Sequence, residues 1–259
     1  MSLVQHDIVT ILRRAGCVFA EDEARLLIEA ASSQDDLADM VRRRVDGLPL
    51  EQILGWAEFC GLRVVVQPGV FVPRKRTEFL VRRAASMAAP GDLVVDLCCG
   101  TGALGVALSR IVDGIHVVAS DLDPAAVRCA RANVEPLGGR VFGGDLFDAL
   151  PRELMGTVDL LLVNAPYVPS DEIAHMPPEA RDHEPRVALD GGRDGVDVHR
   201  RVGAEARRWL APGGHLFVET SVLQAPVTVA AVEAGGLVAR VESSEEVGGT
   251  VVIGSVPTV

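Results

Sequence analysis

One short segment, Asn164-Ala165-Pro166-Tyr167, has residue types that could hold an amino or amide nitrogen for reaction. It follows the apolar run 160–163, which predicts a buried strand. Proline fixes its own backbone and keeps the preceding residue extended, so the turn is rigid. We expect the Asn164 side-chain carbonyl and the Ala165 backbone carbonyl to accept both hydrogens of one NH₂ group, with the Tyr167 ring against it. An ordinary strand-ending Asn-x-Pro turn is the alternative.

A second candidate is the turn from Asp96 to Gly102, which follows one predicted strand and precedes a predicted helix. Glycines here let the backbone approach a ligand closely. Dinucleotide-binding turns are similar, but Cys98 stands where the first glycine of G-x-G-x-x-G belongs. The Asp96 carboxylate would repel a pyrophosphate and attract a sulfonium with its amino group. A turn without any ligand is the alternative. We expect S-adenosylmethionine to be bound by Asp96, Cys98, Gly100, Thr101 and Gly102.

Carboxylates also end two later predicted strands. Asp121 lies roughly 20 residues after the glycine turn, where a carboxylate accepts hydrogen bonds from ribose hydroxyls. We expect Leu122 to lie against the adenine face. Asp145, followed by Leu146, is predicted to accept the exocyclic N–H of adenine, although on its own it would be an ordinary loop residue. Asp123 is interpreted as a helix cap.

The rest of the sequence predicts the elements that position these residues. Helices are expected near 4–14, 21–31 and 34–45, and a hairpin over 56–67. Strand and helix patterns then alternate, which predicts a doubly wound α/β domain with a parallel sheet, whose ligands lie at the carboxyl ends of the strands. The predicted strands are 93–97, 115–120, 140–143, 158–163, 215–220, 237–241 and 250–253, and the predicted helices are 102–110, 124–135, 196–210 and 223–234.

Composition narrows the function classes. The net charge of −11 disfavours a nucleic-acid substrate. Five cysteines without a CxxC predict neither a disulfide framework nor a zinc site. The start of the chain shows no signal-peptide pattern and no apolar run is long enough to span a membrane, so we expect a cytoplasmic protein. No metal is expected, because His175, His183 and His199 lack ligand spacing and are interpreted as surface or loop residues.

The segment 164–167 resembles the N-P-P-Y signature of amino-group N-methyltransferases. These include the DNA adenine enzymes and the PrmC/HemK family, whose members methylate a glutamine N5 of peptide chain release factors. Three further stretches are similar to the second group: 50–62 to its interdomain hairpin, 72–78 to I-P-R-x-x-T-E, and 184–195 to E-P-x-x-A-L-x-G-G-x-D-G. The chain is identified as a divergent member, because Ala165 replaces the first proline and Cys98-Cys99 the usual glycine-bearing pair.

This resemblance implies a class I S-adenosylmethionine-dependent methyltransferase fold, Rossmann-like with an antiparallel last strand. It implies a helical substrate-recognition domain at 1–50, a hairpin linker at 51–72 and a catalytic domain at 73–259. The implied reaction methylates a protein glutamine, with a release factor as partner and S-adenosylhomocysteine as product, and we expect a monomer. The residues to which it assigns catalysis are Asn164, Ala165, Pro166 and Tyr167, with Asn164 also at the cofactor.

The remaining expectations and alternatives concern the substrate cleft and the kind of substrate. Arg74, Thr77 and Glu78 are implied to shape the cleft, but junction packing and a helix start explain them equally well. The long stretch 168–194 is predicted to form a wall of the substrate cleft and to become more ordered with substrate. A basic groove across 42–44 and 74–76 would instead favour an amino-group methyltransferase acting on RNA, DNA or a small molecule. A non-enzymatic cofactor-binding protein is disfavoured by Asn164 and Tyr167.

Overall fold

The computed structural model describes residues 5–257, and their first part is a group of helices with its own apolar core. The predicted helices are confirmed as α1 (Gln5–Arg14), α2 (Ala20–Ala30) and α3 (Gln34–Val45). Residue 4, included in the first prediction, lies outside the described residues. The Ser33 side chain accepts a hydrogen bond from the Asp36 backbone N–H, which caps α3. A short helix that was not predicted, α4 (Leu50–Leu54), follows.

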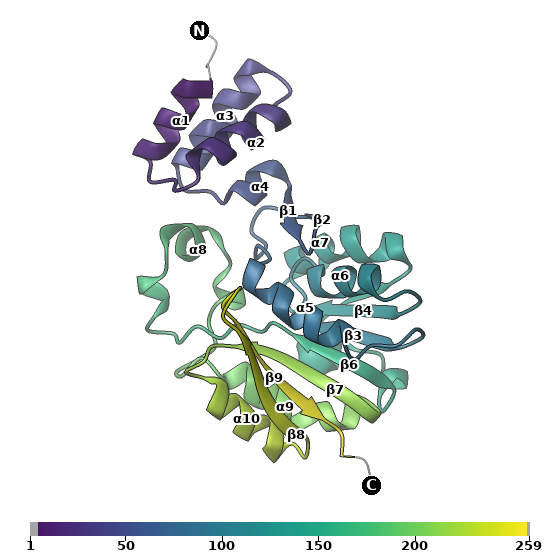
Figure 1. Cartoon of the computed structure of the whole chain (residues 1–259). Coiled ribbons are helices and arrows are strands. Elements are labelled where there is room, and N and C mark those ends of the chain that lie inside the picture. Colours follow the sequence, from purple (N-terminus) through teal and green to yellow (C-terminus); the bar gives the residue numbers. More distant parts are fainter. Residues whose placement is uncertain (1–4, 258–259) are drawn as a thin grey trace.

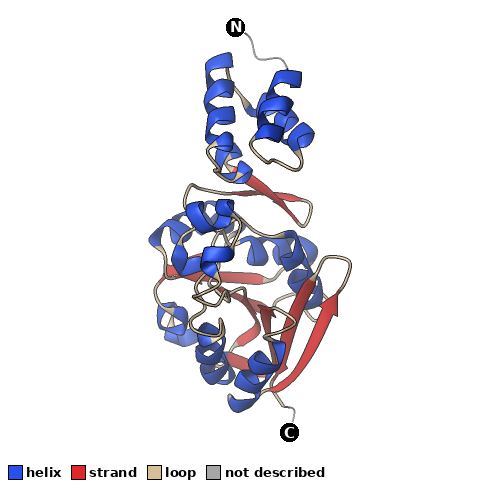
Figure 2. Cartoon of the chain, turned by 90° about the vertical axis from the view of Figure 1, so that its left-hand side faces the viewer, coloured by secondary structure: helices blue, strands red, loops and turns tan. Residues whose placement is uncertain are grey.

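The predicted hairpin is present as β1 (Trp56–Phe59) and β2 (Leu62–Val65), which pair antiparallel. Cys60 and Gly61 form its turn, both with positive φ. The hairpin lies between the first helices and the rest of the molecule (Figure 2). Two elements follow for which no range was predicted from the sequence. They are the 3₁₀ turn η1 (Lys75–Thr77) and the helix α5 (Glu78–Ala85).

The large sheet has seven strands in the order β5-β4-β3-β6-β7-β9-β8. All neighbouring pairs among β5, β4, β3, β6 and β7 are parallel, whereas β9 pairs antiparallel with both β7 and β8. The doubly wound fold with an antiparallel last strand is therefore confirmed. The strands are β3 (Leu93–Leu97), β4 (His116–Asp121), β5 (Arg140–Gly143), β6 (Val158–Val163), β7 (Leu210–Thr220), β8 (Val238–Ser244) and β9 (Gly249–Ser255).

Helices cover both faces of this sheet (Figure 1). Successive strand residues face opposite sides, so Val94 packs with α5 and α6 while Val95 packs with α9 and α10. A further apolar cluster joins α7 to β4 and β5. These helices are α6 (Ala103–Ile111), α7 (Pro124–Val134), α9 (Asp197–Trp209) and α10 (Ala225–Ala234).

The long connection after β6 is not a structureless loop. It contains the 3₁₀ turns η5 (Ile173–His175) and η6 (Arg186–Ala188), with α8 (Pro178–His183) between them. Figure 1 shows α8 between the first helices and the sheet. Within residues 5–257, no helix combines the length and apolar character needed to cross a membrane.

Candidate active site

A cavity of about 460 Å³ lies at the carboxyl ends of β3, β4, β5 and β6, where the parallel strands end at a common edge. The turns after these strands all reach it, as the doubly wound topology requires. The structure thus brings most of the predicted residues together. Those that line the cavity are Arg74, Thr77, Cys98, Gly100, Thr101, Asp121, Leu122, Asp145, Leu146, Asn164, Ala165, Pro166 and Tyr167.

The glycine turn has the left-handed backbone that its sequence predicts. Cys98, Gly100 and Gly102 have φ values of 58°, 55° and 76°. A cysteine in this region carries strain of roughly 1–3 kcal/mol, which explains why glycine is favoured at position 98. Gly102 differs from its predicted role, because it does not line the cavity. It faces α7, and a Cβ there would lie 2.7 Å from the Val134 side chain.

Asp96 is the clearest correction among the predicted cofactor residues. It is fully buried beneath the turn and does not line the cavity. Its Oδ2 accepts a hydrogen bond of 3.0 Å from the Gly105 backbone N–H, while Oδ1 has no partner within residues 5–257. Burial raises the pKa of Asp96 to about 8, so the side chain is largely protonated at neutral pH. Asp96 therefore supports the turn from below.

Asp121 both lines the cavity and holds the glycine turn in place. Its Oδ2 accepts from the Gly100 N–H at 2.8 Å, and its Oδ1 accepts from the Asp123 N–H at 2.9 Å. Burial raises its pKa above the ordinary value. Asp123 caps α7 by accepting from the Ala125 N–H, as predicted. Leu122 is 55% exposed on the cavity side, a position open to a planar ring.

Asp145 has a partner that the sequence did not indicate. Its carboxylate pairs with Arg201 of α9 at 2.7 Å, and both residues line the cavity. The two positions are 56 residues apart, so no local pattern relates them. Leu146, next to Asp145, has a left-handed φ of 46° and is buried in the cavity floor.

Asn164 directly follows β6 and lines the cavity. No hydrogen bond within the described chain occupies that side chain, so both of its polar atoms are free for a ligand. Ala165 is buried at 2% exposure and also lines the cavity. The pair of acceptors proposed from the sequence is therefore compatible with the position of the turn.

Tyr167 is fixed by charged residues from distant parts of the chain. Its hydroxyl donates to Glu219 Oε1 at 3.0 Å and accepts from Arg76 Nη2 at 2.9 Å. Glu219 of β7 is buried, and its second oxygen has no partner within residues 5–257. Burial and the neighbouring carboxylate raise the pKa of Tyr167 to about 12, so it stays a hydrogen-bond donor. Sequence reasoning missed Arg76 and Glu219, for which no motif existed.

Of the three residues predicted at the domain junction, Arg74 and Thr77 line the cavity and Glu78 does not. Arg74 lines the cavity and pairs at 2.5 Å with Glu184, which also accepts from the Val72 N–H at 3.1 Å. The segments 72–78 and 184–195 are thus bound to each other. Thr77 lines the cavity with a buried hydroxyl that has no partner in the described part of the chain. Glu78 does not line it; instead it accepts from the Cys60 N–H in the hairpin turn.

The connection after β6 contributes to the cavity wall, as predicted, through residues of α8 and η6 and of the segments beside them. Glu179 of α8 pairs with Arg44 of α3. Arg44 is itself buried and also pairs with Glu23 at 2.6 Å. Arg74 and Arg76 have carboxylate partners as well. The arginines 44, 74 and 76 therefore do not form the free basic groove that a nucleic-acid substrate would favour.

His199 also differs from its interpretation as a surface or loop residue. It is completely buried on α9, and its Nδ1 lies 3.0 Å from the Thr228 hydroxyl. Burial lowers its pKa to about 4, so the ring is neutral at pH 7. The signal was present, since His199 shares helical spacing with the apolar positions Val202 and Ala206. Within residues 5–257 no group of three His, Cys, Asp or Glu side chains could hold a metal ion.

This sheet order, with a cavity at the carboxyl ends of the parallel strands, is the class I S-adenosylmethionine-dependent methyltransferase fold. The model of the methyltransferase small domain family matches residues 61–176. The release factor glutamine methyltransferase of Mycolicibacterium smegmatis is 41% identical over 76% of this chain and 72% of its own length. The chain belongs to the release factor glutamine methyltransferase family.

Two further relatives and one solved structure are also similar to this chain. The release factor glutamine methyltransferase of Geobacter sulfurreducens is 41% identical over 72% of this chain, which spans 65% of that relative's length. A 4-amino-L-phenylalanine/4-methylamino-L-phenylalanine methyltransferase of Streptomyces pristinaespiralis is 42% identical over 69% of this chain and 63% of its own length. A methyltransferase of Pyrococcus furiosus has the same fold, with a TM-score of 0.58 at 17% identity, covering 84% of this chain and 98% of that structure.

Proposed function

We propose that this chain transfers a methyl group from S-adenosylmethionine to the side-chain amide nitrogen (N5) of a glutamine in a peptide chain release factor. The position of Asn164 carries the proposal. Its unoccupied amide shares one cavity with the glycine turn and with Asp121. Acceptor and donor would therefore meet within a single site.

The residues around the glycine turn fit the cofactor. Gly100 exposes backbone at the cavity, and Asp121 would accept from the ribose hydroxyls. Asp145 and the apolar Leu122 and Leu146 would hold the adenine. Asp96 would act through the turn that it supports. S-adenosylmethionine would supply a methyl group on a sulfonium, which is a strong electrophile with a good leaving group.

The residues of the turn after β6 would position the acceptor. A glutamine amide nitrogen is a poor nucleophile because its lone pair is delocalised. Asn164 Oδ1 and the Ala165 carbonyl would accept its two hydrogens, which orients the nitrogen and stabilises positive charge developing on it. Correct positioning of this kind can contribute about 7–11 kcal/mol. No strong base is needed, because the methylated cationic nitrogen releases a proton readily.

We further propose that residues 1–50 recognise the substrate, 51–72 link the parts, and 73–259 carry catalysis. Two features support this division. The first helices have an apolar core separate from that of the sheet. Arg44 on α3 also contacts Glu179 in the cavity wall, so the helices border the cleft. A release-factor substrate places the reaction in the cytoplasm, and we expect a monomer, which size-exclusion chromatography tests.

A free aromatic amino acid is a second candidate, because the Streptomyces pristinaespiralis relative is named for 4-amino-L-phenylalanine. Such a substrate carries a carboxylate that would need a cation. The arginines that line the cavity within the described chain, Arg74, Arg76 and Arg201, already pair with Glu184, Glu219 and Asp145. This arrangement favours a neutral side-chain amide over a free amino acid.

The test is label transfer from tritiated S-adenosylmethionine to unmethylated release factor of the same organism, with 4-amino-L-phenylalanine in a parallel reaction. We expect label on the glutamine of the Gly-Gly-Gln loop, and none with the Asn164→Ala protein. Label on the amino acid alone would replace the proposed substrate with the second candidate. No label in either reaction, with cofactor binding intact, would reject both.

A further inference from the structure

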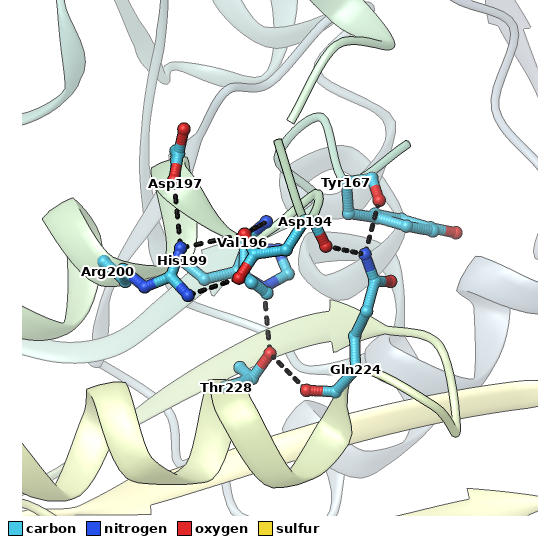
Figure 3. A network of polar contacts seen from close by, with 8 residues as sticks. All are labelled: Tyr167, Asp194, Val196, Asp197, His199, Arg200, Gln224 and Thr228. Atoms are coloured by element: carbon cyan, nitrogen blue, oxygen red, sulfur yellow. Dashed lines mark hydrogen bonds and ion pairs between the residues drawn. The ribbon is translucent and has the colours of Figure 1, made fainter. Parts of the chain in front are cut away.

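The turn after β6 is held by one glutamine that does not itself line the cavity. Gln224 precedes α10, and its side-chain Nε2 donates to the Tyr167 carbonyl at 2.8 Å and to the Asp194 carbonyl at 3.0 Å. Its Oε1 accepts from the Ser221 hydroxyl at 2.7 Å. Both hydrogens and the oxygen of this amide are therefore used, and Figure 3 shows the Gln224 side chain reaching both carbonyls.

A glycine makes room for this contact. Gly195 has a φ of 78°, and a Cβ at that position would lie 2.2 Å from Gln224 Nε2 and 2.3 Å from the Tyr167 carbonyl oxygen. Any larger residue would displace the amide or the turn. The glycine at the end of the 184–195 segment thus has a physical reason, namely the close approach of the Gln224 side chain.

The residues on both sides of Gln224 are themselves fixed. The Thr228 hydroxyl donates to the Gln224 backbone carbonyl at 3.3 Å and lies 3.0 Å from His199 Nδ1. The Asp194 carboxylate accepts from Arg200 at 2.9 Å. Figure 3 shows these contacts joining α9, α10 and the segment before α9. Gln224 therefore connects the backbone of Tyr167 to the packed helices α9 and α10.

We propose that Gln224 is a positioning residue for methyl transfer: it fixes Tyr167 from the backbone side, while Arg76 and Glu219 fix the hydroxyl. The inference rests on the proposed function, in which Tyr167 packs against the acceptor amide. Held at both ends, the ring has a single orientation, and the acceptors at 164 and 165 lie in the same short turn. A free Tyr167 carbonyl would let the turn shift, and a displacement of about 1 Å can cost on the order of 10²-fold in rate.

The test compares Gln224→Met, which keeps the length of the side chain but has no N–H, with Leu223→Ala at its 91% exposed neighbour. Hydrogen exchange measures the protection of the backbone amides of 164–170 and 190–195. Steady-state kinetics on the acceptor that the parent protein methylates measure kcat and KM, and calorimetry measures cofactor affinity. For Gln224→Met we expect faster exchange in both segments and a fall in kcat of at least tenfold, with cofactor affinity unchanged, whereas Leu223→Ala should match the parent protein. Gly195→Ala should reproduce this defect.

Exchange does not depend on the identity of the acceptor, so the two proposals fail separately. Parent protein that methylates no release factor rejects the proposed function, while the exchange data still decide whether Gln224 holds the turn. Unchanged exchange in Gln224→Met overturns the inference. Faster exchange with parental kcat would also overturn it, because Gln224 would then be structural only.

Discussion

The Tyr167 hydroxyl lies 3.0 Å from Glu219 Oε1, although the two residues are 52 positions apart in the chain. Arg76 donates to the same hydroxyl, and its Nε lies 3.4 Å from the same carboxylate oxygen. One ring at the acceptor side of the cavity is thus tied to a buried strand residue and to the 3₁₀ turn η1. The ring can reorient only if this charged network is broken.

Tyr167→Phe tests this relationship. The change keeps the ring but removes the donor to Glu219, whose carboxylate is buried. We expect the free energy of unfolding to fall by about 1–3 kcal/mol, the usual cost of an unsatisfied buried group. Urea denaturation measures it, and Glu219→Gln, which retains an acceptor without the charge, serves as the comparison. A Tyr167→Phe protein as stable as its parent would show that the hydroxyl contacts contribute nothing.

Asn164→Ala should separate catalysis from cofactor binding. Loss of a preorganised group at developing charge costs about 10²–10³-fold in kcat. The cofactor contacts proposed for Gly100, Asp121 and Asp145 do not involve the changed side chain, so calorimetric affinity for S-adenosylmethionine should be nearly parental. Methylation at the parental rate would remove Asn164 from its proposed role.

Asp121→Ala should weaken cofactor binding severely. The variant loses the proposed acceptor for ribose and also the contact that holds the Gly100 N–H at 2.8 Å. Loss of hydrogen bonds to a charged group predicts a roughly 10- to 100-fold rise in Kd by calorimetry. Asp123→Ala, which removes the cap of α7, should lower stability with a much smaller effect on affinity. Equal affinities for the parent and Asp121→Ala would mean that the ribose site lies elsewhere.

Arg44 and Glu179 should contribute very unequally to stability. Arg44→Ala leaves Glu23, whose side chain is 11% exposed, without its charged partner. Breaking a buried pair in this way costs about 3–5 kcal/mol. Glu179 is 46% exposed, so Glu179→Ala should cost less than about 1 kcal/mol. Thermal and urea unfolding measure both. Arg42→Ala, at a 68% exposed arginine of the same helix, is the control and should be near neutral.

His199 should make stability depend on pH. Its folded pKa of about 4 lies below the ordinary value of 6.5, so the unfolded chain takes up a proton that the folded chain refuses between these values. The contribution is present above pH 6.5 and is lost as the pH falls toward 4. At pH 5 the loss relative to pH 7 amounts to about 2 kcal/mol. Urea unfolding of the parent and His199→Asn at both pH values measures it, and equal pH dependence in the two proteins would contradict the assignment.

The order of the elements and the edge of the sheet where the site lies both follow from local sequence patterns. Alternating strand and helix patterns place the turns at 98, 121, 145 and 164 after parallel strands, and parallel strands bring their carboxyl ends together. This relation is topological and needs no coordinates. It explains why the predicted cavity residues were found with few exceptions. The first helices and the hairpin could be predicted equally well, because helix caps, turns and apolar periodicity are local signals in the sequence.

The contacts that those residues make depend on how distant elements pack together. Asp96 faces the core because the side-chain alternation of β3 and the missing side chain of Gly105 leave space for it there. Arg76, Glu219 and Gln224 contact Tyr167 from separate elements. A local sequence pattern does not predict contacts between residues so far apart in the chain. Helix packing likewise buries His199, which was expected at the surface or in a loop, and keeps its ring neutral. Local order follows from the sequence, whereas partners and protonation follow from which surfaces the packed elements bury against each other.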